Sequence, residues 1–407
     1  MNSDGKEKKK AEINAKTFPA EEGMRKALIN FLKKSLEKKC FDSVLIPMQV
    51  PETNSYAWVL LEDQSLLDQA NPLPPVMTVQ GGTALSSVAK HGEIHDEIAA
   101  VLRPCEIRAA VELAKLNQIN LDNIILISMD CPGAVPLSDY MADPEKIGEA
   151  FKSTTEKWEI NESLRPICCV CNRFSLEAPG PSASPESSSS DLHIGFAGSN
   201  GKNIFVIPVS PKGDNLMAKL DLSSEDSLAD WESNVAEIRE LREKEKEKFE
   251  KEWQAKLDGT DNFIAQFDDC INCHNCMRTC PICYCQQCYF DSQLMKLSPE
   301  DYLERAKNRG ALRFPLDTIL FHLGRMSHMA LSCISCGACE DACPMSIPVS
   351  QIFTMIGNKT QKDFHYVPGR NREEPLPLQD FVEDEFHEVE TPREDKEMPA
   401  GEAEKNV

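Results

Sequence analysis

The sequence predicts an N-terminal α/β domain with a mostly parallel sheet, followed by a separate C-terminal helical domain. Short β-rich runs alternate with helical segments between about residues 44 and 210, a pattern typical of parallel sheets. After residue 260, two similar four-cysteine runs enclose a stretch with helical periodicity. The chain has 407 residues, enough for two or three domains.

Composition and periodicity divide the chain into five segments. The low-complexity stretch PGPSASPESSSS, residues 179–190, is expected to be a flexible loop inside the first domain. The last residues are acidic and Pro-rich, which favours an extended tail. The predicted segments are a disordered N-terminus at 1–16, the α/β domain at 17–221, a connecting helix at 222–260, the cysteine-rich helical domain at 261–358 and the acidic tail at 359–407.

Apolar residues at helical spacing predict a helix near residues 21–39 and a long charged helix over 223–257. In the second helix, Ser223 with Asp226 resembles a capping box, and an apolar stripe predicts one buried face. Between these helices, six runs read as strands bounded by turn residues: VLIPMQV, YAWVLL, VMTVQ, IAAVLR, NIILIS and NIFVIPV.

The formal net charge of −22 argues against nucleic acid as a partner, because phosphate binding needs a basic surface. No apolar run reaches the length of a transmembrane helix, and the basic N-terminus lacks the apolar stretch of a signal peptide. We therefore expect a cytoplasmic protein without a transmembrane segment.

Cysteine is the unusual residue, with 17 in the chain. A disulfide framework needs an oxidising compartment and usually a short chain, and neither is indicated. In a reducing compartment, clustered cysteines are typical of metal ligands or redox thiols.

Two runs near the C-terminal end share the spacing Cys-x2-Cys-x2-Cys-x3-Cys-Pro. This is the spacing of bacterial ferredoxins, in which the fourth cysteine of each run ligates the other [4Fe-4S] cluster. Three closely spaced thiolates let a tight loop wrap three iron corners, and the proline then turns the chain away. The prediction is one cluster on Cys270, Cys273, Cys276 and Cys343, and another on Cys333, Cys336, Cys339 and Cys280.

Two structural zinc sites are the alternative, although zinc usually takes paired Cys-x2-Cys units. The connector 281–332 is longer than in small ferredoxins and reads as helical, since SPEDYLERAKNRG starts with a Ser-Pro helix entry. It resembles the connector in the α-helical ferredoxin domain of succinate dehydrogenase iron–sulfur subunits and heterodisulfide reductase subunits. The C-terminal domain is thus predicted to be an α-helical, ferredoxin-like dicluster domain, whose second connector helix has the apolar repeat Leu316, Ile319, Leu320, Leu323 and Met326.

Three more cysteines follow the first run, at Cys283, Cys285 and Cys288. They could ligate another cluster or substitute for a ligand, or they could be small hydrophobic residues buried beside a cluster. We favour burial for Cys285 and Cys288 and leave Cys283 open.

The α/β half has cysteines of its own. IAAVLRPCEIRAAVELAKLNQINLDNIILISMDC reads as strand, Pro-Cys turn, helix and strand, with Pro104 at the first helical position. Cys105 and Glu106 then lie in the first helical turn, where the helix N-terminus lowers a thiol pKa. Ligands of parallel sheets bind beyond the carboxyl ends of strands. The four strand-end cysteines could therefore hold a third cluster, or they could be scattered core and surface thiols. They are Cys105, Cys131, Cys168 and Cys171.

The turn Gln80-Gly81-Gly82-Thr83 precedes a predicted helix. Glycines at such a turn let the backbone approach a phosphate at the helix N-terminus. The pattern G-x-G-x-x-G is absent, so a plain tight turn is the alternative.

Taken together, several segments resemble one family. They are GGTALSS near residue 81, LRPCEIRAAVEL near 102, CINCHNCMRTCPICYCQQC, CISCGACEDACP, and HYVPGRNREEPLPL near 365. The family is the beta subunit of coenzyme F-420 hydrogenase and formate dehydrogenase, and the resemblance is greatest to the bacterial branch with a C-terminal 4Fe-4S dicluster domain.

This resemblance implies an oxidoreductase subunit whose α/β domain binds FAD and passes electrons between the clusters and a two-electron carrier such as coenzyme F-420. The turns from Gly81 to Thr83 and from Arg103 to Glu106 would then line the flavin or cluster side of the sheet. The implied partners are a soluble electron carrier and a catalytic redox subunit of the formate dehydrogenase, hydrogenase or heterodisulfide reductase type. A pure electron-wiring subunit, with clusters and no flavin, is the alternative.

Overall fold

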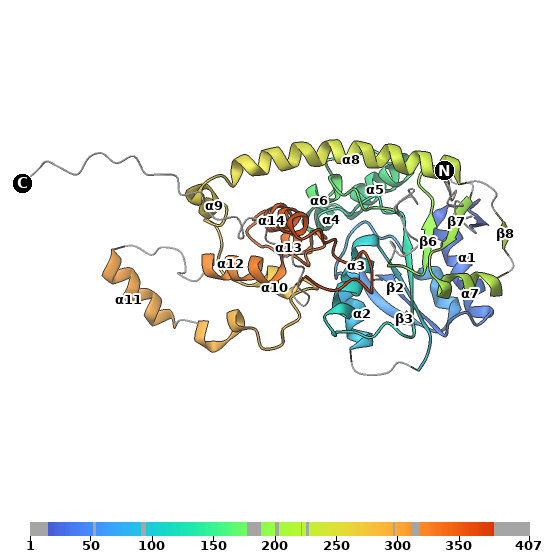
Figure 1. Ribbon diagram of the computed structural model, residues 1–407, viewed down its shortest axis with the longest axis horizontal. Coiled ribbons are helices and arrows are strands. Elements are labelled where there is room, and N and C mark those ends of the chain that lie inside the picture. Colours follow the sequence, from blue (N-terminus) through green and yellow to red (C-terminus); the bar gives the residue numbers. More distant parts are fainter. Residues whose placement is uncertain are drawn as a thin grey trace, which may run out of the picture.

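In the computed structural model, the chain forms two packed parts joined along one long helix (Figure 1). The structure describes residues 15–51, 54–90, 95–176, 189–199, 203–220, 222–224, 228–295, 298–310 and 318–377. The predicted disordered segment 1–16 and the predicted loop 179–190 lie mostly outside these residues. Lys16 is described, however, and begins strand β1 (Lys16–Pro19).

An eight-stranded mixed sheet forms the N-terminal part, in the order β3-β2-β4-β5-β6-β7-β1-β8. The central strands β2, β4, β5 and β6 run parallel, whereas β3 on one side and β7, β1 and β8 on the other pair antiparallel. A mostly parallel sheet is therefore correct for the centre only. The bounds are β2 (Ser43–Val50), β3 (Ser55–Leu61), β4 (Ile98–Leu102), β5 (Ile124–Met129), β6 (Leu192–Gly195), β7 (Asn203–Pro208) and β8 (Ser223–Ser224).

The run VMTVQ, residues 76–80, was predicted as a strand and is not one. Its Val76 and Met77 are buried, while Val79 is 45% exposed, so the segment packs as an irregular connection. Strands β1, β6 and β8 gave no sequence signal because they have only four, four and two residues.

Alternate residues of the central strands feed two separate cores. Ala99 and Val101 of β4 pack on the side of α1, whereas Ala100 and Leu102 pack on the side of α2 and α3. Helices therefore cover both faces of the sheet. The bounds are α1 (Met24–Glu37), α2 (Gly81–Ala89), α3 (Pro104–Lys115), α4 (Leu137–Ala142), α5 (Pro144–Lys157), α6 (Pro166–Cys169) and α7 (Pro211–Lys219).

Helix α8 (Ala229–Lys256) runs along both parts of the molecule (Figure 1). Its first half buries Trp231 and Val235 in the core of the α/β part, and its second half buries Phe249 and Trp253 in the core of the C-terminal part. The predicted buried stripe is confirmed. The predicted capping box is wrong, because Ser223 belongs to β8 and the helix starts only after Leu228.

The C-terminal part is helical, and α11 projects away from it (Figure 1). The predicted apolar repeat of its helix α12 is only partly buried, since Met326 lies in the core and Ile319 packs against it. Leu320 and Leu323 are 52% and 48% exposed, whereas His322 and Arg325 are buried. The bounds are α9 (Thr260–Ala265), α10 (Asn275–Arg278), α11 (Pro299–Arg309), α12 (Thr318–Met329), α13 (Ala338–Asp341) and α14 (Val349–Asp363).

The segment after α14 is not an extended tail where the structure describes it. Residues 364–377, here called the strap, return to the α/β part, and Tyr366 and Leu376 are buried. Residues 378–407 lie outside the described part. Within the described ranges, no helix combines the length and apolar character that crossing a membrane requires.

Candidate functional site

The two cysteine motifs adopt the same backbone course. In the first, Asn272 and His274 have left-handed φ values of 53° and 62°, and in the second Ser335 and Gly337 have φ values of 56° and 79°. These positions fall two and four residues after the first cysteine of each motif. A short helix then begins at the fifth position, α10 in one motif and α13 in the other. Alternating right- and left-handed residues curl a backbone so that successive amides face one concave side.

The first cysteine set joins both motifs, as the spacing predicts. Cys270, Cys273 and Cys276 of the first motif share a pocket with Cys343 of the second. Burial, opposed by Arg325 and supported by the other three thiols, raises the pKa of Cys276 to about 11. Four thiols that influence one another in a single pocket are a suitable ligand set for a cubane cluster.

The second cysteine set also joins both motifs, with three cysteines from the second motif and one from the first. Burial raises the pKa of Cys333 to about 11 and that of Cys336 to about 12, and Cys280 of the first motif adds to both effects. The pKa of Cys339 rises for the same two reasons. Protonated thiols of this kind release their protons when a metal binds, which couples metal affinity to pH.

The curled backbone of the two motifs and the grouping of their cysteines in two sets of four are both suited to binding two clusters. Across the described part of the chain, no three Cys, His, Asp or Glu side chains converge as one metal ion would require. A cubane needs a wider set, because its four ligands sit on four different iron corners.

The three cysteines after the first motif have separate surroundings. Cys283 lies beside Cys280 and contacts Met329, with its Sγ 2.8 Å from the Sδ of that methionine. Cys288 is half-buried against Met277, as expected for a small hydrophobic residue. Cys285 is exposed, so the expectation that it is buried is wrong.

The third cysteine set lies at the carboxyl end of the central strands. Cys105 stands in the first turn of α3, after β4, and Cys131 follows β5. The thiols of Cys131, Cys168 and Cys171 influence one another, and Cys131 also acts on Cys105. Cys168 lies in α6 and Cys171 follows that helix, so the prediction that the pair follows a strand is wrong. The structure thus brings the four cysteines into one neighbourhood.

Two buried arginines frame this third set. Arg103 donates from Nη1 to the carbonyl oxygen of Gly133 at 2.5 Å and lies 3.9 Å from the Sγ of Cys131. Arg242 of α8 donates to the carbonyl oxygens of Cys171 at 3.2 Å and Pro132 at 2.9 Å. Both cations offset negative charge, which a set of metal-bound thiolates would supply.

Cys105 differs from the prediction in its acidity. A helix N-terminus alone would lower its pKa. Burial dominates instead and, with Glu106, Cys131 and Cys336 nearby, raises the pKa of Cys105 well above its usual range. Because Cys336 belongs to the second cysteine set, this effect also shows that the second and third sets are neighbours.

Two arginines of the α/β part bind the second motif directly. Arg108 of α3 donates from Nη2 to the carbonyl oxygen of Ile334 at 2.9 Å. Arg165 donates to the carbonyl oxygen of Cys336 at 3.1 Å and forms a buried ion pair with Asp341. The loop around the second set is thereby fixed against the carboxyl edge of the sheet.

The backbone amides of the predicted glycine turn already donate to side chains of the protein. The amide of Gly81 donates to Glu106 Oε1 at 3.1 Å, and the amides of Gly82 and Thr83 donate to Gln80 Oε1 at 2.6 and 3.3 Å. A Cβ on Gly82 would lie 2.8 Å from the Cβ of Ala109, so this glycine lets α2 and α3 pack closely. A cofactor-binding role for Gly81, Gly82 and Thr83 stays a prediction.

A pocket beside α3 was not predicted from the sequence. Three arginines from distant segments line it, with serines between them, in a chain of net charge −22. We call it the arginine pocket, and it includes Arg108, Arg173, Arg370, Ser175, Ser189 and Ser190. Ser189 and Ser190 fall in the predicted flexible loop, but both are buried. Widely separated arginines give no local motif, which is why sequence reasoning missed the pocket.

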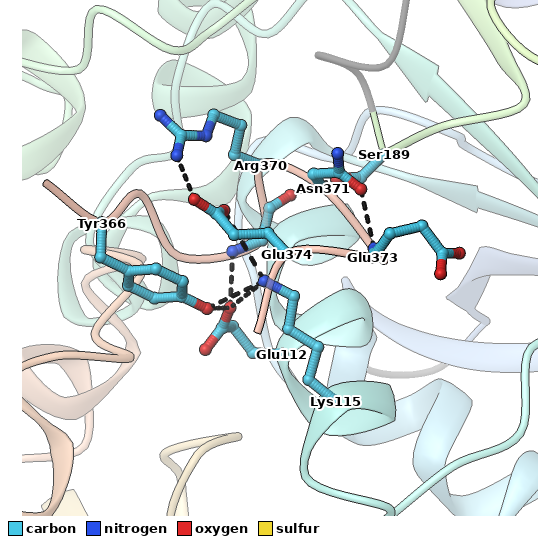
Figure 2. Close-up of polar contacts among 9 residues, drawn as sticks. Glu112, Lys115, Ser189, Tyr366, Arg370, Asn371, Glu373 and Glu374 are labelled. Carbon is cyan, nitrogen blue, oxygen red and sulfur yellow. Dashed lines mark hydrogen bonds and ion pairs between the residues drawn. The ribbon is translucent and has the colours of Figure 1, made fainter. Parts of the chain in front are cut away.

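The strap forms one wall of the arginine pocket and is anchored on Glu112 of α3 (Figure 2). Glu112 is fully buried and accepts hydrogen bonds from the Tyr366 hydroxyl and from the Gly369 amide, the latter at 2.7 Å. Lys115 pairs with Glu112 at 3.7 Å, and Figure 2 shows the side chains of Lys115, Glu112 and Tyr366 converging. A buried carboxylate with several donors holds the strap in place.

Comparison with known proteins gives the identity of this arrangement. Residues 266–347 match the family described as a 4Fe-4S dicluster domain. The F420-dependent formate dehydrogenase 1 subunit beta of Methanococcus maripaludis is 30% identical over 376 residues, which cover 86% of this chain and 92% of that protein. The F420-dependent formate dehydrogenase subunit beta of Methanocaldococcus jannaschii is 28% identical, covering 67% and 74%.

A solved structure of the F420-reducing [NiFe] hydrogenase complex from Methanosarcina barkeri contains a chain that aligns with a TM-score of 0.41 and 12% identity, covering 61% of this chain and 94% of that one. Sequence similarity over nearly the whole length, together with the dicluster match, is the firmer result. The chain belongs to the family of F420-dependent formate dehydrogenase beta subunits, and its C-terminal part is a 4Fe-4S dicluster domain.

Proposed function

We propose that this chain passes electrons between [4Fe-4S] clusters and a flavin that serves a two-electron carrier. The observation that carries the proposal is the position of Arg108, which lines the arginine pocket and also donates to Ile334 in the loop of the second cysteine set. A pocket for an anionic cofactor and a ligand loop thus share one side chain. Such adjacency is what electron exchange between a flavin and a cluster needs.

In this proposal each cysteine set holds one cluster. The first comprises Cys270, Cys273, Cys276 and Cys343, the second Cys280, Cys333, Cys336 and Cys339, and the third Cys105, Cys131, Cys168 and Cys171. When bound, the clusters supply one-electron steps and the flavin couples them to two-electron chemistry. The protein fixes the spacing of the sets, shields them partly from water and balances their charge with the buried Arg103, Arg165 and Arg242.

The arginine pocket is the proposed place for the pyrophosphate of FAD. Guanidinium groups bind such oxygens through paired N–H donors, and serine hydroxyls supplement them. The glycine turn at Gly81 is a weaker candidate, since its amides already have acceptors. Arg103, Cys105 and Glu106 would act beside the flavin, on the cluster side of α3.

The names of the relatives suggest the remaining parts of the reaction. We propose that the partner is the catalytic subunit of a formate dehydrogenase and that coenzyme F420 is the two-electron carrier. Electrons from formate oxidation would enter at one cluster and leave through the flavin.

Anaerobic analysis of iron, sulfide and flavin per chain tests the proposal. About twelve irons and one flavin per chain are the expected result, because each cubane holds four irons. About eight irons would remove the third cluster from the proposal. Iron and sulfide without flavin would refute the flavin site and favour an electron-wiring subunit. A colourless, iron-free protein after anaerobic reconstitution would refute the whole assignment.

A further inference from the structure

Arg325 is a buried cation in the middle of the dicluster domain. It lies on α12, between the two motifs in sequence, and is 2% exposed. Its Nη1 donates to the Sγ of Cys276 at 3.1 Å, and its Nη2 donates to the carbonyl oxygen of the same residue at 3.1 Å. Arginine is among the residues least often fully buried, unless a partner carries the opposite charge.

No carboxylate plays that part. Within the described ranges, no Asp or Glu forms an ion pair with Arg325. The guanidinium is instead covered by two aromatic rings, with its central carbon 4.7 Å from the ring centre of Phe353 and 5.5 Å from that of Phe321. These rings exclude water from the cation and strengthen its electrostatic effect on its surroundings.

The groups that act electrostatically on Arg325 are cysteine thiols of both sets. Burial opposes the positive charge, but four thiols outweigh it and raise the pKa of Arg325. Cys276 belongs to the first cysteine set and Cys280 and Cys339 belong to the second, while Cys283 stands beside Cys280. Arg325 therefore acts on both sets from one position.

A second basic side chain of α12 lies near the first set. His322, one turn before Arg325, has its Nε2 3.4 Å from the Sγ of Cys270. Arg325 carries the permanent charge of the two, because a guanidinium stays protonated in proteins.

We propose that Arg325 is a positioning residue that sets the reduction potentials of both clusters, by stabilising the negative charge that each gains on reduction. The inference rests on the proposed ligand assignment. Each reduction adds one electron from the donor, transfers no proton and makes the four-thiolate site more negative by one charge. Net charge and hydrogen bonds to sulfur are two of the factors that fix such potentials.

The test uses full-length, anaerobically reconstituted protein and EPR-monitored titration with dithionite as the one-electron donor. Arg325→Gln removes the charge at similar length, and both clusters are expected to become harder to reduce, with potentials shifted to more negative values. The cluster that includes Cys276 should shift more, because only its ligand receives a direct hydrogen bond from Arg325. Arg325→Lys keeps the charge and should leave both potentials near those of the wild type.

Arg278 provides a matched control. It lies two residues from both Cys276 and Cys280 in sequence, yet it is solvent-exposed and paired with Asp291 at 3.0 Å. Arg278→Gln is expected to leave both potentials unchanged. Equal shifts in R278Q and R325Q would overturn the proposal, since any nearby charge would then have the same effect.

The remaining outcomes also decide the matter. If R325Q binds wild-type iron and its potentials do not move, Arg325 is only a structural anchor and the inference is wrong. If R325Q fails to fold or to hold iron, the R325K variant decides alone. Wild-type iron content with strongly lowered potentials in R325K would overturn a role for the charge. Unchanged potentials in R325K would support it. An iron-free wild type would instead refute the proposed function, independently of Arg325.

Discussion

Arg165 Nη2 and Asp341 Oδ2 form a buried ion pair that joins the α/β part to the dicluster domain, with side chains 3% and 11% exposed. The partners lie 176 residues apart in sequence. Arg165 also donates to the carbonyl oxygen of Cys336, so the same guanidinium fixes the docking of the domain and the loop of the second cysteine set.

Breaking this pair should loosen the interface between the two parts. Asp341→Asn leaves Arg165 buried without its counter-charge, which costs about 3–5 kcal/mol. The free energy of unfolding, from denaturant melts under anaerobic conditions, measures it. Asp291→Asn is the control, because the exposed Arg278–Asp291 pair contributes at most about 1 kcal/mol. Similar losses in the two variants would contradict a special role for the buried pair.

The third cysteine set predicts a specific change in metal content. Cys105→Ser and Cys171→Ser should each lower the iron content by about four per chain and leave the other clusters intact. Cys285→Ser is the matched control, since this thiol is exposed, and it should leave iron unchanged. Iron and sulfide analysis with quantitative EPR checks the result. Wild-type iron in both test variants would show that these are ordinary core thiols.

The close packing of Gly369 against α3 suggests a substitution that should release the strap. Its φ is +70°, and a Cβ there would lie 2.4 Å from the Cα of Arg108, so Gly369→Ala must push the strap off α3. We expect weaker flavin binding and faster proteolysis within the strap. Gly310→Ala is the control: its φ is +73° but no atom lies within 4 Å of the new Cβ, so only the backbone cost of about 1 kcal/mol remains.

Equal flavin content and equal proteolysis in G369A and G310A would show that the strap has no part in closing the arginine pocket. Tyr366→Phe is a milder test of the same contact, because it deletes only the hydroxyl that donates to Glu112. Its expected cost is about 1.5–3 kcal/mol, as for a hydrogen bond to a charged group.

Asp130 predicts a large loss of stability in the α/β part. This fully buried carboxylate accepts hydrogen bonds from the amides of Phe196 and Ala197 at 2.7 and 2.8 Å and from Trp231 Nε1 at 2.8 Å. Burial alone would raise its pKa, but His193, Ser175 and Trp231 hold the pKa below its usual value. Asp130→Asn should therefore cost about 3 kcal/mol or more in the free energy of unfolding.

Asp122 offers the comparison for this variant, since it is an exposed aspartate of the turn before β5. Asp122→Asn should change the free energy of unfolding by less than about 0.5 kcal/mol. A comparable loss in D122N and D130N would mean that the buried network contributes little.

The cysteine spacing predicted the neighbourhoods of the dicluster domain well, because ligand geometry is encoded locally. Cys343 lies with Cys270, Cys273 and Cys276, and Cys280 lies with the second motif, as the spacing predicts. Three of the four parallel strands, β2, β4 and β5, were predicted for a similar reason, since each is a local apolar run, whereas the four-residue β6 was missed.

Hydrophobic periodicity predicted that α12 is a helix but only part of its buried face, and the difference has a physical cause. Met326 of the repeat is buried, but Leu320 and Leu323 are exposed, and the helix buries His322 and Arg325 as well. Cysteine sulfurs supply the opposite charge that makes burial of Arg325 favourable, and no periodicity scale includes that partner. The strap and the arginine pocket were missed because their contacts join residues far apart, such as Glu112 and Gly369, which are separated by 257 positions.

Helix α8 has a consequence for how the protein can be dissected. Its 28 residues place Trp231 in one hydrophobic core and Trp253 in the other. A cut on either side of the helix would leave one half with an open apolar groove. Because both hydrophobic cores depend on this one helix, the dicluster domain should not fold by itself when it is separated from the α/β part. The two parts should therefore be expressed as one chain.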